Sequence, residues 1–448
     1  MKVSSGMRIS TLEAEHNECT AVTNWPCDEI KNDSWVNLGR QLPQVPMRAS
    51  DCDCLSLAVA VAILAASFSV VDQRMQVDYS LCLQRLALPA GGYLARLTLN
   101  APAKLNAIGP EMAERLLHTL MVLRDDAEAV AVFIDGAGDR GFCGGADVLR
   151  MLESALANPG GAAIEAEALL RCEYMAAYLI HTFPKPVICW ADGRVRGAGL
   201  GLMAGASHRI VTERSQLSVS EASIGLIPTA GASWYLGQMP GYTGLFAALT
   251  GVELGPADAL YSGLADYCWD SQSKESLLNS LLELSWEEDP EANSELLTDC
   301  LTDWEVEQGV SLQDAPLKAH RPWIDKHCER RCVRALQAAL ERDARRNDWL
   351  ALALDGANRG AASALKLIVR QFADSRGLGL ADVFRLEMVL AANRLRDPEF
   401  AEGVRARFKD RDECPNWCYR CVDEVPDEET NALFVPPWDR HPLADLGR

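Results

Sequence analysis

Two segments rich in small residues could present backbone N–H groups to a bound ligand. The first is GFCGGAD (141–147), which follows an apolar run, and the second is GRVRGAGLG (193–201), which opens an apolar small-residue helix. Small side chains let a ligand approach the backbone, and the free amides at a helix start face negative charge. Either segment alone is also typical of a plain turn or of a closely packed helix. Together they favour an oxyanion hole, in which two N–H groups stabilise the charge that develops on a carbonyl oxygen.

One carboxylate follows these segments in a setting that suits proton transfer. Glu221 ends the strand-like run SVSE (218–221) and precedes a Gly/Pro turn, among small and apolar neighbours. Burial of a carboxyl group raises its pKa toward neutrality, which suits a general acid or base. The alternative is a solvated carboxylate at a strand end, the more common fate of an isolated Glu.

The elements that must position these residues alternate between strands and helices. Residues 93–99 alternate apolar and polar side chains, which predicts a strand, and Pro110 opens a helix at its first position. The short apolar runs 129–134, 186–190 and 209–212 are typical of buried parallel strands. This alternation predicts an α/β fold. Strand signals stop near residue 270, and helical patterns such as 361–372 and 380–394 follow.

The three segments, in this order, resemble the enoyl-CoA hydratase/isomerase (crotonase) superfamily. FCGGAD (142–147) is similar to its first oxyanion loop, RGAGLGL (196–202) to its second, and LNA (105–107) to its CoA-binding loop. LIHTFPKPVICW (179–190) and FAEGVRARFKDRDECPNW (400–417) resemble the 3-hydroxyisobutyryl-CoA hydrolase branch. The resemblance runs over residues 78–435, more loosely over 290–350. It implies a crotonase-like ββα spiral core with a helical C-terminal region.

The resemblance also implies roles for individual residues. Ala146 and Ala198 stand where backbone N–H groups form the oxyanion hole, Glu221 stands at the catalytic glutamate, and Thr229 lies in the turn that completes the catalytic site. No cofactor is expected, since CoA is part of the substrate, and no metal. The residues expected to bind the substrate are Leu105, Ala107, Gly144, Gly145, Asp147, Gly197 and Gly199.

Two departures from the family pattern bear on the activity. Hydratases carry a second Glu in the second loop, where this chain has Gly201. The hydrolase branch also lacks that Glu, so the chain resembles this branch at Gly201. The hydrolase branch usually has Asp where this chain has Thr229, a hydroxyl that donates and accepts but holds no charge. We expect hydrolysis of a small 3-hydroxyacyl-CoA, 3-hydroxyisobutyryl-CoA in valine catabolism, by an oxyanion hole and one Glu. The alternatives are a single-Glu enoyl-CoA isomerase or hydratase-type enzyme and a catalytically impaired CoA-binding homologue.

Composition and charge restrict the partners. The 448 residues carry a formal charge of −20, which disfavours a nucleic-acid partner. An anionic CoA ligand would therefore need backbone N–H groups and a local basic rim. The 15 cysteines favour free thiols in a reducing cytoplasm, and a zinc knuckle at Cys414, Cys418 and Cys421 is the less favoured alternative. Cys143 and His208 are interpreted as structural. A homo-oligomer is possible.

The chain is expected to have three parts. Residues 1–74 are interpreted as an unrelated or poorly ordered extension, 75–270 as the CoA-thioester-binding core, and 271–448 as a helical C-terminal region with an irregular tail. Within the extension, residues 54–71 carry no charge. This length is at the lower limit of a membrane span, and a soluble appendage is favoured over an anchor.

Overall fold

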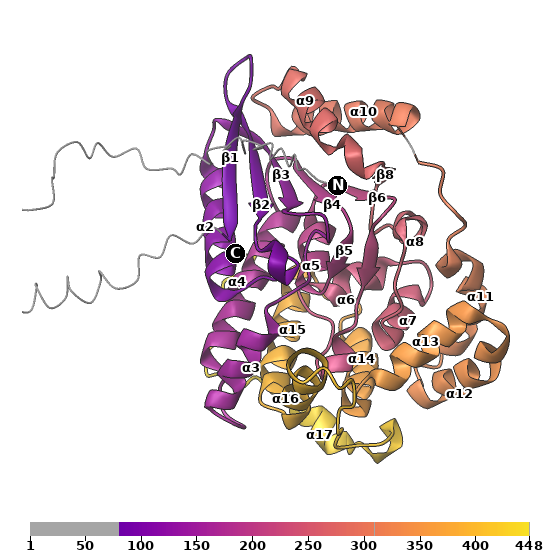
Figure 1. Ribbon diagram of the computed structural model, residues 1–448. Coiled ribbons are helices and arrows are strands. Elements are labelled where there is room, and N and C mark those ends of the chain that lie inside the picture. The colour runs from indigo at the N-terminus through magenta and orange to yellow at the C-terminus, as the bar shows by residue number, and fades with distance from the viewer. Residues whose placement is uncertain (1–79, 309, 448) are drawn as a thin grey trace, which may run out of the picture. The chain divides into compact units, whose positions relative to one another are not determined.

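The computed structural model describes residues 80–308 and 310–447 (Figure 1). The predicted extension, with its uncharged segment 54–71, lies outside the described residues. Within the described ranges, no helix is long and apolar enough to cross a membrane.

A six-stranded sheet forms the centre of the fold, in the order β1-β2-β3-β4-β6-β8. The β1–β2 pair is antiparallel, and every later pair is parallel. A separate parallel pair is formed by β5 and β7. The strands are β1 (Leu81–Ala87), β2 (Tyr93–Leu99), β3 (Ala129–Gly136), β4 (Val187–Ala191), β5 (Arg194–Arg196), β6 (His208–Thr212), β7 (Gln216–Ser218) and β8 (Tyr267–Trp269).

The helices fill the crossovers between strands and make up nearly all regular structure after β8, as Figure 1 shows. Those that precede the end of β8 are α2 (Pro110–Asp125), α3 (Val148–Ala157), α4 (Ile164–His181), α5 (Ala198–Gly205), α6 (Ala232–Tyr235), α7 (Thr243–Thr250) and α8 (Pro256–Ser262). Those that follow are α9 (Lys274–Glu283), α10 (Pro290–Gln308), α11 (Pro316–Cys328), α12 (Val333–Asp343), α13 (Asp348–Arg359), α14 (Ala362–Asp374), α15 (Leu380–Leu395), α16 (Pro398–Val404) and α17 (Asp427–Ala432).

The sheet is buried on both faces, which explains why its central strands read as continuous apolar runs. In β4, Cys189 packs into the larger core with α2 and α4, whereas Ile188 and Trp190 pack into a second core with leucines of α9 and α10. Because side chains of a strand alternate between faces, both sets must be apolar. The expected α/β fold and the strand at 93–99 are confirmed, and Pro110 is the first residue of α2.

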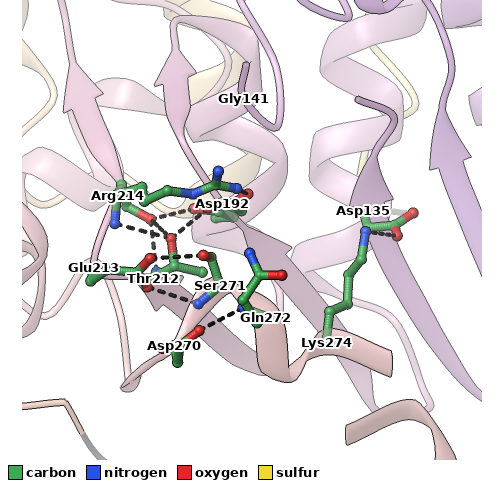
Figure 2. A network of polar contacts seen from close by, with 12 residues as sticks. Asp135, Gly141, Asp192, Thr212, Glu213, Arg214, Asp270, Ser271, Gln272 and Lys274 are labelled. Atoms are coloured by element: carbon green, nitrogen blue, oxygen red, sulfur yellow. Dashed lines mark hydrogen bonds and ion pairs between the residues drawn. The ribbon is translucent and has the colours of Figure 1, made fainter. Parts of the chain in front are cut away.

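Polar side chains join the carboxyl ends of the parallel strands on the sheet (Figure 2). Asp135 at the end of β3 is fully buried and accepts hydrogen bonds from Lys274, at 3.0 Å, and from Arg96. Beyond β4, Asp192 accepts from Thr212 at 2.6 Å and pairs with Arg214. These contacts satisfy buried or half-buried charges and fix the strand ends from which the two small-residue loops depart.

Candidate active site

A cavity of about 460 Å³ lies between the two small-residue loops, the segment around Glu221 and the C-terminal region. It brings together residues that the sequence places far apart. The predicted site residues that line it are Leu105, Ala107, Gly144, Gly145, Ala146, Asp147, Gly197, Ala198, Glu221 and Thr229. Ten of the eleven residues expected in the site therefore line this one cavity, and the exception is Gly199.

The first loop is held against the LNA segment by backbone hydrogen bonds. The amide of Gly144 donates to Leu105 O at 2.7 Å, and Gly145 O accepts from the amide of Ile108 at 2.8 Å. Gly145 has φ of 95°, a conformation that suits glycine. The amide of Asp147 donates to Ile108 O at 2.8 Å, so the backbone is fixed on both sides of Ala146. The amide of Ala146 itself has no protein acceptor among residues 80–308 and 310–447.

The second loop approaches the first so closely that glycine is needed. Gly197 has φ of 49°, and a Cβ built on it would lie 3.1 Å from Oε1 of Glu221. A Cβ built on Gly145 would lie 3.6 Å from the amide nitrogen of Ala198, so the two loops are neighbours. Ala198 is the first residue of α5, and its amide also lacks an acceptor in the described part of the chain. Two N–H groups without acceptors and one carboxylate thus line the same cavity. Free backbone N–H groups are the kind of donor that can stabilise a developing oxyanion.

Gly199, which the sequence predicts in the substrate site, is not among the residues that line this cavity. A Cβ on Gly199 would lie 2.6 Å from the Cβ of Cys143, so this glycine lets α5 pack on the first loop. Gly201 is confined in the same way, since a Cβ there would meet the Cβ of Ala230 at 2.6 Å. A glutamate at Gly201 would therefore displace its neighbours.

The side chains of Cys143 in the first loop and Asn106 in the LNA segment have structural roles. Burial raises the pKa of the Cys143 thiol to about 12, and the thiol contacts Asn106 O at 3.3 Å, which agrees with a packing role. Asn106 is fully buried with φ of 53°, and its amide donates to Ala137 O and Gly141 O at 2.9 and 3.0 Å. Asn tolerates this left-handed conformation better than most residues, so it shapes the loop that presents Leu105 and Ala107.

Asp147 lines the cavity, but its carboxylate is already engaged. It caps α3 by accepting from the amide of Arg150 and forms an ion pair with Lys104 at 2.9 Å. A carboxylate at a helix start is stabilised by the helix dipole. Asp147 therefore fixes the exit from the first loop and holds a cation at the cavity mouth.

Glu221 has the environment that the sequence predicted for it. It begins a short 3₁₀ helix, Glu221–Ile224, and its Oε2 atom is buried without a hydrogen-bond partner in the described residues. Desolvation raises its pKa to about 7, an effect that the backbone and the guanidinium of Arg407 partly oppose. The carboxylate is thus poised to take or release a proton near neutrality.

A second carboxylate in the cavity escaped the sequence analysis. Glu173 of α4 lines the cavity and is 1% exposed, and both its oxygens lack partners among the described residues. Burial, and then the charge of Glu221, raise its pKa to about 8. Helical spacing could have revealed it. Glu173 lies four positions after Leu169 and four before Ala177, which places its side chain on the buried face of α4. The site therefore contains two coupled carboxyl groups where one Glu was expected.

The buried Glu173 should make the protein less stable as pH rises. Its pKa is raised in the folded state, so the folded protein holds a proton that the unfolded chain releases, and this contribution is lost as pH rises toward about 8. The free energy of unfolding of the parent should therefore fall between about pH 6 and 8, and in Glu173→Gln this fall should be smaller by about 2 kcal/mol. Urea denaturation at several pH values measures the free energy of unfolding of both proteins. Glu165→Gln, on the exposed face of the same helix, should keep the parent slope, and an unchanged slope in Glu173→Gln would contradict this assignment.

The C-terminal helices hold the turn that contains Thr229. Glu387 of α15 is fully buried and accepts from the amides of Gly231 and Ser233, both at 2.7 Å. Gln371 of α14 donates to Pro228 O at 2.9 Å, and the buried Arg394 donates to Gly225 O at 2.7 Å. Hydrogen bonds in which one partner is ionised are stronger than neutral ones. The C-terminal region is therefore part of the site.

Six basic side chains, called the basic rim below, line the cavity of this acidic protein. Its members come from the LNA loop, the first and second small-residue loops and the segment after α16. They are Lys104, Arg140, Arg194, Arg196, Arg407 and Arg411.

The remaining candidates lie elsewhere. His208 is buried and contacts the hydroxyls of Ser207 and Thr298, which agrees with a structural role. Cys414, Cys418 and Cys421 are exposed free thiols. Within residues 80–308 and 310–447, no group of three or more His, Cys, Asp or Glu side chains is arranged to hold a metal ion.

Comparison with known proteins finds relatives by sequence and relatives among solved structures. The chain is 29% identical over 342 residues to the mitochondrial 3-hydroxyisobutyryl-CoA hydrolase of Gallus gallus, which covers 76% of this chain and 86% of the relative. It is also 29% identical over 367 residues to 3-hydroxyisobutyryl-CoA hydrolase 1 of Arabidopsis thaliana, with 79% and 94% covered.

Among solved structures, a carnitinyl-CoA dehydratase from Mycobacterium thermoresistibile superposes with a TM-score of 0.71 at 27% identity. The alignment covers 83% of this chain and all of that one. An enoyl-CoA hydratase from Rhodobacter sphaeroides gives a TM-score of 0.68 at 27% identity, with 80% and 98% covered. The sequence profile of the enoyl-CoA hydratase/isomerase family matches residues 94–434. The chain therefore belongs to the enoyl-CoA hydratase/isomerase family.

Proposed function

We propose that the protein hydrolyses a short acyl-CoA thioester. The observation that carries the proposal is the cavity in which the free amides of Ala146 and Ala198 stand beside Glu221. The names of the relatives support it, since both hydrolases from Gallus gallus and Arabidopsis thaliana act on 3-hydroxyisobutyryl-CoA. The basic rim offers charge for the anionic CoA moiety.

In this mechanism the thioester oxygen binds between the two amides, which stabilise the negative charge as the carbonyl carbon becomes tetrahedral. In one route Glu221 takes a proton from water, the water oxygen forms the new C–O bond, the C–S bond breaks, and Glu221 returns the proton to the departing CoA thiolate. In the other route Glu221 attacks the carbonyl carbon, and the thiolate leaves as a mixed anhydride forms. Water then cleaves the anhydride, restores the Glu221 carboxylate and supplies the proton that the thiolate takes up. The products are a free acid and CoA. Glu173 keeps its proton below about pH 8 and can donate a hydrogen bond to the acyl group or water.

The family analogy points to 3-hydroxyisobutyryl-CoA, and hence to valine catabolism in a reducing compartment. The test is a thiol-release assay of the full chain on a panel of acyl-CoAs that includes this compound. Turnover well above the spontaneous rate supports the proposal. Background rates on every member of the panel would refute it. Thr229→Asp, assayed beside the parent, reports whether the neutral Thr229 limits turnover.

A second candidate is water addition or elimination across a double bond of an enoyl-CoA. The observation that favours it is the pair Glu173 and Glu221, since that chemistry uses two carboxyl groups. The structural relatives named as dehydratase and hydratase agree with it. Absorbance of the conjugated enoyl thioester and thiol release, measured together on an enoyl-CoA, distinguish the two reactions. Hydration lowers the absorbance without releasing thiol, whereas hydrolysis releases one thiol for each thioester lost.

A further inference from the structure

Two arginines lie at the reacting end of the cavity. Arg196 ends β5 directly before Gly197, whose position beside Oε1 of Glu221 was described above. Arg407 lies in the turn Arg405–Lys409 after α16, and its guanidinium donates to the hydroxyl of Ser223 in the 3₁₀ helix that Glu221 begins. Both arginines line the same cavity as Glu221 and Thr229.

The positive charge of these arginines is poorly compensated. The nearest carboxylate to Arg196 is that of Glu253, at 3.8 Å, and the Nε atom of Arg196 is buried without a partner in the described residues. Arg407 forms no ion pair within residues 80–308 and 310–447; Glu413 and Glu221 act on it only at longer range, and Arg359 opposes them. Burial and neighbouring guanidinium groups lower the pKa of both arginines. Both side chains are partly buried, and the Arg196 side chain is 34% exposed. A bound counter-charge would stabilise partly buried guanidinium groups of this kind.

The CoA phosphates are unsuited to be that counter-charge. The pantetheine arm separates them from the thioester, and in the proposed mechanism the thioester carbonyl binds at the amides of Ala146 and Ala198. Arg196 lies two positions before Ala198, and Arg407 contacts Ser223, two positions after Glu221. Lys104, Arg140, Arg194 and Arg411 remain for the phosphates.

Two other residues of the cavity add little negative charge near neutral pH. Thr229 is neutral and 8% exposed, so it offers a hydroxyl donor where an Asp would repel negative charge. Glu173 is largely protonated below about pH 8. Arginine binds carboxylates through two parallel N–H groups, which gives geometric selectivity as well as charge.

We propose that the preferred acyl group carries a second carboxylate, so that the substrate is the mono-CoA thioester of a short dicarboxylic acid. Arg196 and Arg407 hold the free carboxylate while the thioester occupies the oxyanion hole. The proposal rests on the hydrolase function proposed above and names its substrate class. Replacing the CH₂OH group of 3-hydroxyisobutyryl by a carboxylate gives methylmalonyl, a probe of nearly the same size.

The test compares charged and neutral acyl-CoAs of similar size. Thiol release is measured for methylmalonyl-CoA against isobutyryl-CoA, and for succinyl-CoA against butyryl-CoA. We expect kcat/KM to be at least tenfold higher for the charged member of a pair. Arg407→Gln and Arg196→Gln should each erase most of that ratio, whereas the exposed Arg345→Gln should leave it as in the parent.

The same comparison by calorimetry separates failure of this inference from failure of the hydrolase function. Glu221→Gln protein should bind succinyl-CoA at least tenfold more tightly than butyryl-CoA, even if no thioester is turned over. Equal affinity for the two would overturn the inference. An equal loss for charged and neutral ligands in Arg407→Gln, with the same loss for free CoA, would also overturn it and assign this arginine to CoA.

Discussion

Glu221→Gln should lower thioester hydrolysis by about three orders of magnitude, because general acid–base and nucleophilic groups contribute on this scale. The amide is nearly isosteric with the carboxyl group, but it can neither accept a proton nor attack the carbonyl carbon. Since burial raises the pKa of Glu221 to about 7, the parent kcat/KM should increase with pH up to about 7. The residual activity of the variant should lack this increase. Stopped-time thiol release over a range of pH measures both effects.

Glu153→Gln provides the matched control for this prediction. Glu153 is exposed on α3, where it pairs loosely with Arg150 at 3.7 Å, and such surface pairs contribute little to stability. We expect parent rates from the control. A Glu221→Gln protein that folds as the parent does and keeps more than a tenth of its activity would assign the catalytic role to another group, with Glu173 the first to test.

Ala198→Pro should reduce kcat by about 100- to 1,000-fold, the cost of one lost oxyanion donor. Proline removes the amide hydrogen that the mechanism places on the thioester oxygen. Ala198 is the first residue of α5, a position where proline is well tolerated because the N–H has no partner within the helix. Initial rates at saturating substrate measure the loss, and the affinity for free CoA should change little.

Ala198→Gly is the control, since it keeps the N–H group and removes only a methyl group. We expect it to retain activity within about tenfold of the parent, since glycine at a helix start has a modest cost. The thermal unfolding midpoints of both variants establish that the fold persists. Equal activity of the proline and glycine variants would show that the Ala198 amide does not contact the reacting oxygen.

Local sequence patterns predicted the loops that meet at the cavity, because the conformation of each loop depends on residues that are close together in the chain. Small residues after a strand indicated where amides would be exposed, and Glu221 stood next to a recognisable turn. A pattern of small residues does not, however, distinguish a glycine that faces a ligand from one that packs on a neighbouring loop, as Gly199 packs on Cys143.

Long-range contacts account for what was missed. The spacing of Glu173 placed it on the buried face of α4, but only the packing of α4 against α5 and α15 reveals that this face meets the cavity. The bond between Glu387 and the amide of Gly231 joins residues 156 positions apart. No local periodicity contains such a contact, because it depends on how the C-terminal helices return to the core.

The contacts of Glu387, Gln371 and Arg394 have a consequence for synthesis of the chain. The turn that carries Thr229 leaves the ribosome long before α14 and α15, so its amides and carbonyls have no native partners while the nascent chain grows. Catalytic geometry can form only after about residue 395 has emerged and α15 has docked. A truncated chain that ends before this point would contain both small-residue loops and Glu221 but would lack the side chains that hold the turn.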